Sequence, residues 1–179
     1  DQFVDAVVRD VRNLKMGAGE GNAFGALIDE AQVAVTERHV ADALAKGAKV
    51  LTGGKRPSGP GTFYEPTVLV DVDHSMACMT DETFGPVIPV MSYRTVDEAV
   101  ALANDTEFGL SAAVFAGTLD EARAVAERIN AGGLSLNDAA LTRETYEAEK
   151  NSFGYSGMGG SRMGAAGLLR FYRKKALLM

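Results

Sequence analysis

Cys78 and Glu82 stand four residues apart in the stretch "CMTDETFGPV", and a nucleophile with a neighbouring base requires these residue types. Cys78 is the only cysteine in the chain of 179 residues. Its neighbours Met76, Ala77 and Met79 are apolar, however, and apolar surroundings raise the pKa of a thiol. The residues therefore predict that Cys78 is a small buried side chain rather than a catalytic thiolate.

The two histidines, His39 and His74, do not suggest a metal or a catalytic triad. They lie far apart, and neither has a Cys or His at the spacing of metal ligands. The same scarcity weakens any Ser-His-Asp or Cys-His scheme. We expect no metal site, with His39 facing solvent on a helix and His74 in a loop.

The same stretch combines an acid and an aromatic side chain at a tight turn. Glu82 and Phe84 precede Gly85 and Pro86, which force the chain to turn before a strand. A carboxylate there can accept two hydrogen bonds from a vicinal diol such as a ribose, and a phenyl ring can pack beside a flat heterocycle. From residue chemistry alone, a turn with merely solvated acids is an equally good interpretation.

Two glycine-rich stretches do not match the dinucleotide-binding fingerprint. "GAGEGN" has Asn22, and "GMGGSR" has Arg162, where the third glycine belongs. The first stretch also follows a predicted helix, whereas the fingerprint follows a strand. Any contact that this chain makes with a nucleotide is expected to be partial.

Composition and charge narrow the range of partners and compartments. The net charge of −6 argues against a nucleic-acid partner, and no apolar run is long enough to cross a membrane. A single cysteine excludes an internal disulfide framework, and the N-terminus lacks a signal peptide, so we expect a cytoplasmic protein. The chain begins at Asp1 within a helical pattern, which we interpret as a piece of a longer protein.

The hydrophobic pattern predicts an α/β fold. Helices are expected over residues 3–14 and 29–46, followed by strands in "AKVLTGG" and "YEPTVLVDV". Residues 87–138 then alternate strand, helix, strand, helix, strand. Both helices begin with capping-box pairs, Thr95 with Glu98 and Thr118 with Glu121. This order predicts a mainly parallel sheet flanked by helices. "SFGYSGMGGSRMG" predicts an irregular loop, and the apolar C-terminus predicts a strand that pairs with another subunit.

Five stretches in this order resemble the C-terminal part of the NAD(P)-dependent aldehyde dehydrogenase superfamily. They are "YEPTVLVDV", "DETFGPVIPV", "ANDTEFGLSAAVF", "INAGGLSLND" and "FGYSGMGGSRMG", and the resemblance covers essentially the whole chain. It implies an oxidoreductase that converts an aldehyde to a carboxylic acid with NAD or NADP, through a cysteine thioester. The family's G-Q-x-C and E-L-G-G-K motifs are absent here. The resemblance therefore implies no catalytic residue in this chain, with the nucleophile and the glutamate base before Asp1.

The resemblance also implies roles for four residues. Glu82 and Phe84 match the family's cofactor-binding glutamate and aromatic residue. Asn137 and Phe153 match positions that line the path of the substrate. The chain departs from the usual F-G-G pattern at Tyr155, which follows the first glycine.

The resemblance implies a partial catalytic domain over residues 1–160 and a segment for subunit assembly over residues 161–179. The C-terminal strand would then join the chains of a homo-oligomer, either a dimer or a tetramer. Three alternatives stay open: a relative that forms an acyl-coenzyme A, one that reduces an acyl phosphate, or a non-catalytic α/β assembly module. With no membrane or nucleic-acid partner expected, the partner implied is a small aldehyde.

Overall fold

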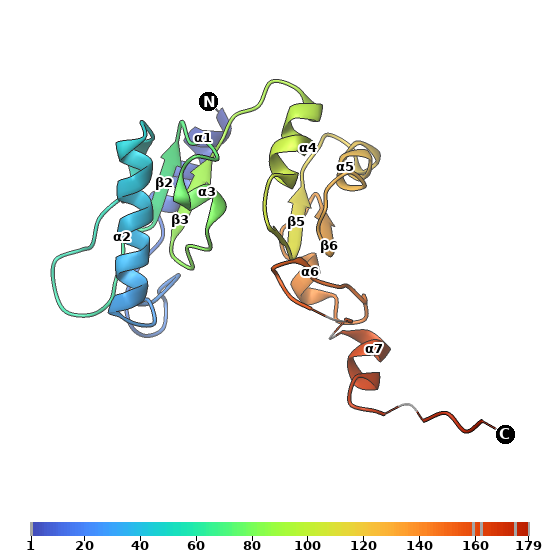
Figure 1. The fold of residues 1–179 in the computed structure, drawn as a ribbon. Helices are drawn as coiled ribbons and strands as arrows, with labels where there is room; N and C mark the ends of the chain where they lie inside the picture. Colours follow the sequence, from blue (N-terminus) through green and yellow to red (C-terminus); the bar gives the residue numbers. More distant parts are fainter. Residues whose placement is uncertain (1, 159, 162, 174, 179) are drawn as a thin grey trace. The chain divides into compact units, whose positions relative to one another are not determined.

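The computed structural model describes residues 2–158, 160–161, 163–173 and 175–178, which form two compact units (Figure 1). The first unit covers Asp1–Ser92 and the second covers Tyr93–Met179. This division by packing differs from the functional division predicted at residue 160, which stays a prediction.

The first unit is built on a three-stranded sheet with the order β1-β2-β3. β1 pairs with β2 in the antiparallel direction, and β2 pairs with β3 in the parallel direction. The elements are α1 (Gln2–Arg12), α2 (Glu30–Ala45), β1 (Lys49–Thr52), β2 (Thr67–Val70), α3 (Ala77–Thr80) and β3 (Val87–Val90).

Helices cover both faces of this sheet. Neighbouring residues of a strand point to opposite faces, so Val68 and Leu69 of β2 belong to two different layers. On one face, Val8 and Val11 of α1 pack against Val68. On the other, Ala43 of α2 packs against Leu69, and Figure 1 shows α2 lying alongside the strands.

The predicted helix over residues 29–46 is confirmed by α2, and its ends have clear local causes. Asp29 is the N-cap, and its side chain accepts a hydrogen bond of 2.8 Å from the backbone N–H of Gln32. Beyond Lys46, Gly47 has a φ of 103°, a left-handed conformation that glycine adopts easily and that ends the helix.

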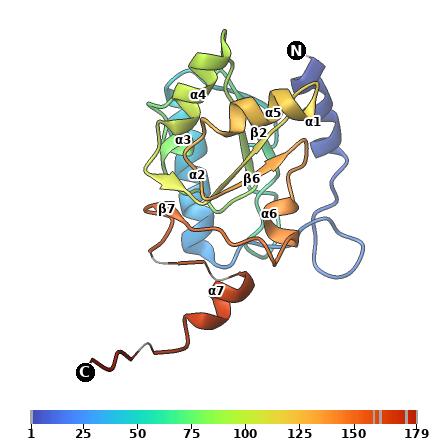
Figure 2. The ribbon, with the colours of Figure 1, turned by 90° about the vertical axis from the view of Figure 1, so that its right-hand side faces the viewer.

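The second unit contains a parallel pair, β5 and β6, and a short antiparallel pair, β4 and β7. Figure 2 shows α7 as the last helix before the C-terminal residues. The elements are α4 (Val96–Asn104), β4 (Phe108–Gly109), β5 (Ser111–Val114), α5 (Leu119–Ala126), β6 (Gly133–Leu136), α6 (Leu141–Glu144), β7 (Phe153–Gly154) and α7 (Gly164–Leu169).

Of the two predicted capping boxes, one forms completely. At α5, Thr118 accepts from the N–H of Glu121, and the Glu121 side chain accepts from the N–H of Thr118. At α4, Thr95 accepts from the N–H of Glu98. The Glu98 carboxylate, however, accepts from the N–H of Arg94 at 2.7 Å, one residue before the predicted partner.

The α/β class is confirmed, but the single, mainly parallel sheet is not. The strands lie in separate sheets rather than in one. The sheet of the first unit mixes parallel and antiparallel pairs, because β1 reaches β2 through a loop without a helix and therefore runs antiparallel to it. The predicted C-terminal strand is not found in the described part of that segment, where α7 is followed by residues 170–173 and 175–178 without a strand. Within the described residues, no helix is long and apolar enough to cross a membrane.

Candidate functional site

The loop of residues 81–86, here called the Glu82 loop, joins α3 to β3 and is tied down at both ends. The N–H of Asp81 donates to the carbonyl of Ala77 at 2.8 Å, which ends α3. At the other end, the N–H of Thr67 in β2 donates to the carbonyl of Pro86 at 2.8 Å. The loop therefore starts and finishes on regular structure of the first unit.

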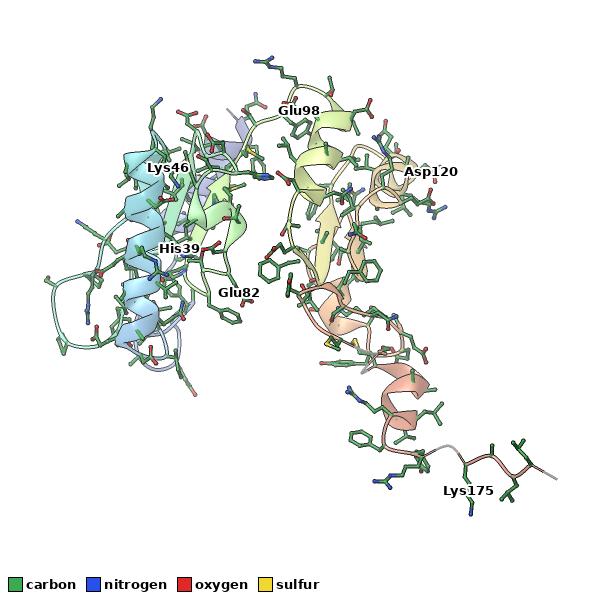
Figure 3. The ribbon with its side chains drawn as sticks, in the orientation of Figure 1. His39, Lys46, Glu82, Glu98, Asp120 and Lys175 are labelled. Carbon is green, nitrogen blue, oxygen red and sulfur yellow. The ribbon has the colours of Figure 1, made fainter. Side chains whose placement is uncertain are left out.

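Glu82 and Phe84 project from this loop into solvent. Phe84 is 74% exposed and has a φ of 44°, a left-handed conformation that is unusual for an aromatic residue. Glu82 is exposed (Figure 3), and its carboxylate has no hydrogen bond or ion pair with any residue that the structure describes. Glu82 thus stands two residues from an exposed ring, an arrangement that agrees with both interpretations of this turn, a binding site for a diol and a heterocycle or a turn with solvated acids.

Thr83, between them, points the other way and is held by α2. The Gln32 side-chain amide donates to the Thr83 carbonyl at 2.5 Å. The Nδ1 atom of His39 shares a hydrogen bond of 3.0 Å with the Thr83 hydroxyl. Next to it, Gly85 lies so close to Thr36 that a Cβ atom at residue 85 would come within 2.4 Å of the Thr36 Oγ1 atom.

The prediction that His39 faces solvent is wrong. Its side chain is 1% exposed and lies on the buried face of α2 with Thr36 and Val40. Burial lowers the pKa of His39, and the positive charge of Arg38 lowers it further, whereas Asp81 and Asp42 oppose the shift. His39 is thus a neutral imidazole at pH 7 that serves as a hydrogen-bonding partner of the Glu82 loop.

Cys78 lies in α3 within the hydrophobic core, as predicted. It is 8% exposed and packs in the cluster that contains Leu69 and Met76. Burial raises the pKa of its thiol. The opening pair of thiol and carboxylate is therefore not a nucleophile with its base, because the thiol is buried and protonated while Glu82 faces solvent.

Asn137 follows β6 and has a left-handed backbone with a φ of 51°. Its side-chain Oδ1 atom accepts a hydrogen bond of 2.8 Å from the N–H of Ala116, just beyond β5. Its own N–H donates to the carbonyl of Val114 at 2.8 Å. Asn137 thus joins the carboxyl ends of the two parallel strands of the second unit, while its side chain remains exposed.

Phe153 lies in β7 and is 39% exposed. Gly109, which lies opposite Phe153 in β4, allows a close approach: a Cβ atom at Gly109 would lie 2.8 Å from the Phe153 Cβ atom. The segment is also held by the Ser156 hydroxyl, which accepts from the N–H of Gly109 at 2.9 Å. The glycine-dense stretch of residues 152–164 was predicted to be irregular, and its described residues are so apart from the two residues of β7 and Gly164, the first residue of α7; Arg162 lies outside the described residues.

The α2 residues Gln32, Thr36 and His39 are the part of the site that sequence reasoning missed. Their spacing of four and three residues places them on one helix face, the same face that carries Val33, Val40 and Ala43. That periodicity could have identified His39 as buried. Among the described residues, no group of three His, Cys, Asp or Glu side chains is placed to hold a metal ion.

The family model of the aldehyde dehydrogenase family matches residues 1–177 of the chain. The chain belongs to this family. A relative described as a "Putative succinate-semialdehyde dehydrogenase [NADP(+)] 2" of Mycobacterium ulcerans is 41% identical over 181 residues, which cover 99% of this chain and 35% of the relative.

Two solved structures of the family also resemble the chain. One is titled "The Structure of Putative Aldehyde Dehydrogenase PutA from Anabaena variabilis"; it is 50% identical with a TM-score of 0.94, over 99% of this chain and 39% of that one. The other is betaine aldehyde dehydrogenase from Staphylococcus aureus in complex with NAD+, 33% identical with a TM-score of 0.87, over 96% of this chain and 35% of that one. The chain therefore spans between a third and two fifths of the length of these family members.

Proposed function

We propose that this chain is the C-terminal part of an enzyme that oxidises an aldehyde to a carboxylic acid with NAD or NADP as cofactor. The proposal is supported by the family match over residues 1–177. It is also supported by the names of two family members, one with NADP+ and one determined with NAD+.

The observation that carries the proposal is the Glu82 carboxylate, which has no partner among the described residues and stands near the exposed Phe84 ring. Glu82 would accept hydrogen bonds from the two hydroxyls of the nicotinamide ribose, and Phe84 would pack beside the cofactor. When bound, the cofactor supplies the acceptor for the hydride of the substrate. The residues of this chain hold and orient that cofactor.

Cys78 does not take part in the chemistry of this proposal, because a buried thiol with a raised pKa is a poor nucleophile. The cysteine that attacks the aldehyde and forms the thioester, and the glutamate base that helps water to hydrolyse it, would belong to another part of the enzyme. We therefore expect the 179-residue chain alone to form no NADH from an aldehyde. Absorbance at 340 nm would measure this.

Asn137 and Phe153 are proposed to line the path of the aldehyde. Both side chains lie at least partly exposed in the second unit. Asn137 is fixed by its bond to Ala116, and Phe153 by the close packing of β7 on β4. Side chains held in this way present a constant surface to a substrate.

The test is the replacement Glu82→Gln in the complete enzyme. A neutral amide forms weaker hydrogen bonds to the ribose than a carboxylate, so we expect cofactor binding or hydride transfer to fall by roughly 10-fold or more. The matched control is Asp81→Asn, which removes the same charge from the neighbouring exposed acid. If both variants behave like the wild type, Glu82 does not hold the cofactor and the proposal is wrong.

We also propose that the enzyme is a homo-oligomer that uses the C-terminal segment. Large apolar side chains of this segment are strongly exposed within the chain, among them Phe171 at 82% and Leu178 at 95%. A second subunit would bury this surface. Removal of residues 171–179 from the complete enzyme should lower the mass measured by light scattering, and an unchanged mass would refute this role.

A further inference from the structure

Three side chains of α2 form a row beneath the Glu82 loop. Gln32, Thr36 and His39 follow one another at intervals of four and three residues, so they lie on one face of the helix. Thr36 and His39 are buried, at 0% and 1% exposure. Figure 3 shows His39 on α2 and Glu82 on the loop beside it.

This row holds Thr83 through its backbone and its side chain together. Gln32 binds the Thr83 carbonyl, and His39 binds the Thr83 hydroxyl. The Thr36 hydroxyl donates back to the Gln32 carbonyl at 3.0 Å, which fixes the rotamer of the residue that closes on Gly85. The loop is therefore fixed at residues 83 and 85, on either side of Phe84.

These anchors bear on the two exposed residues that flank Thr83. Phe84 keeps its left-handed backbone only if the surrounding structure opposes the strain of that conformation. Among the described residues, Glu82 has no hydrogen bond or ion pair of its own that would orient it. Between the tied ends of the loop at Asp81 and Pro86, the positions of both residues are therefore determined by the anchors at Thr83 and Gly85.

We propose that Gln32 and His39 are positioning residues for the cofactor: by fixing Thr83, they direct the Glu82 carboxylate and the Phe84 ring. This inference rests on the proposed function, because it concerns the same cofactor site. Both α2 side chains bond to Thr83 of the Glu82 loop. Both act through Thr83, so their loss alters the geometry of cofactor binding while the carboxylate itself remains.

The experiment compares conservative and non-conservative replacements of Thr83 in the complete enzyme. Thr83→Val keeps the shape but removes the hydroxyl that bonds to His39, whereas Thr83→Ser keeps the hydroxyl. The readouts are the dissociation constant of NADH, measured by its fluorescence, and the rate of hydride transfer in a single turnover. We expect Thr83→Val to weaken one or both by roughly 3- to 10-fold, and Thr83→Ser to restore most of the loss.

A second variant tests the same anchor from the helix. Gln32→Glu preserves size at a half-buried position, but a carboxylate cannot donate to the Thr83 carbonyl. It should produce a loss of the same kind as Thr83→Val. The control is Thr80→Val on the exposed side of α3, where the hydroxyl bonds only to Asp81, and this variant should match the wild type.

The outcomes separate the two proposals. If Glu82→Gln impairs hydride transfer but Thr83→Val and Gln32→Glu match the wild type, the positioning role is wrong and the proposed function stands. If Glu82→Gln itself has no effect, the proposed function fails and the positioning role fails with it. Impairment by Thr83→Val that Thr83→Ser does not relieve would also overturn the role of the hydroxyl.

Discussion

A side chain introduced at Gly85 would test directly whether α2 supports the Glu82 loop. In Gly85→Ala, the new Cβ atom would lie 2.4 Å from the Thr36 Oγ1 atom and 3.2 Å from its Cγ2 atom. Thr36 cannot rotate away easily, because it is β-branched, fully buried and bonded to Gln32. The loop must therefore move away from the helix.

The structure also suggests a rescue. In the Thr36→Ala background both close atoms are absent, and the nearest remaining atom is the residue-36 Cβ at 3.4 Å, an ordinary contact. Overpacking costs about 1–3 kcal/mol, whereas replacing glycine with alanine at a permitted backbone conformation gains about 0.4–1 kcal/mol from the unfolded state. We therefore expect Gly85→Ala to destabilise the loop by about 1–2 kcal/mol in the wild type and to be neutral or slightly stabilising in Thr36→Ala.

Amide hydrogen exchange of the complete enzyme, followed by mass spectrometry on a peptide across residues 77–92, measures this locally. The N–H of Val87 is a suitable probe because it donates to the carbonyl of Gly85 at 2.8 Å. An increase of roughly 5- to 30-fold in exchange corresponds to the expected loss of stability. Equal acceleration in both backgrounds would show that Thr36 is not the group that the new Cβ meets, and the account of loop support by α2 would be refuted.

Three further predictions concern other residues. Burial lowers the pKa of His39 in the folded chain below its unfolded value of about 6.5, so the unfolded chain binds a proton first as pH falls. The contribution of His39 to folding stability is therefore present above the unfolded pKa and is lost as pH falls toward the folded pKa. As pH falls through about 6.5, urea unfolding should thus show a steeper loss of stability for the wild type than for His39→Asn, with Arg38, Asp42 and Asp81 unchanged; parallel curves would contradict this. Asn137→Ala removes the hydrogen bond from Ala116 and places alanine in a left-handed backbone, so it should destabilise the protein by about 1–3 kcal/mol in thermal unfolding. Asn137→Gly should cost less, because glycine adopts that backbone without strain; equal losses in the two variants would show that backbone strain is not part of the effect. Cys78→Ala should leave aldehyde oxidation by the complete enzyme intact, at a modest cost in thermal stability, and abolished activity in a folded variant would make Cys78 the reactive thiol after all.

Local signals predicted most of the elements correctly. Asp29 before an amphipathic run, and Thr118 followed three residues later by Glu121, are caps whose partners lie within the same turn of chain. Such contacts depend on a few neighbouring residues. For the same reason, the parallel pairing of β5 with β6 could be expected, because α5 alone connects them.

The contacts that shape the site could not be read in this way. Gln32 and His39 meet Thr83 across separations of 51 and 44 residues, so no local pattern links them. The periodicity of α2 could place His39 on the buried face, but it could not name Thr83 as the residue that His39 meets there. The pairing of β4 with β7 was missed for a related reason: each strand has two residues, too few to show alternation.

Backbone strain offers an independent link between the fold and the proposed site. Among the described residues, the non-glycine residues with positive φ are Asp71, Phe84 and Asn137. Two of these three are positions to which the family resemblance gives a role, and that resemblance took no account of conformation. Such conformations persist only where neighbouring contacts impose them, and α2 and the end of β5 supply those contacts here. Buried side chains of α2 hold the loop on either side of Phe84, and backbone groups of Val114 and Ala116 hold Asn137, which explains why an exposed ring and an exposed amide can keep defined positions.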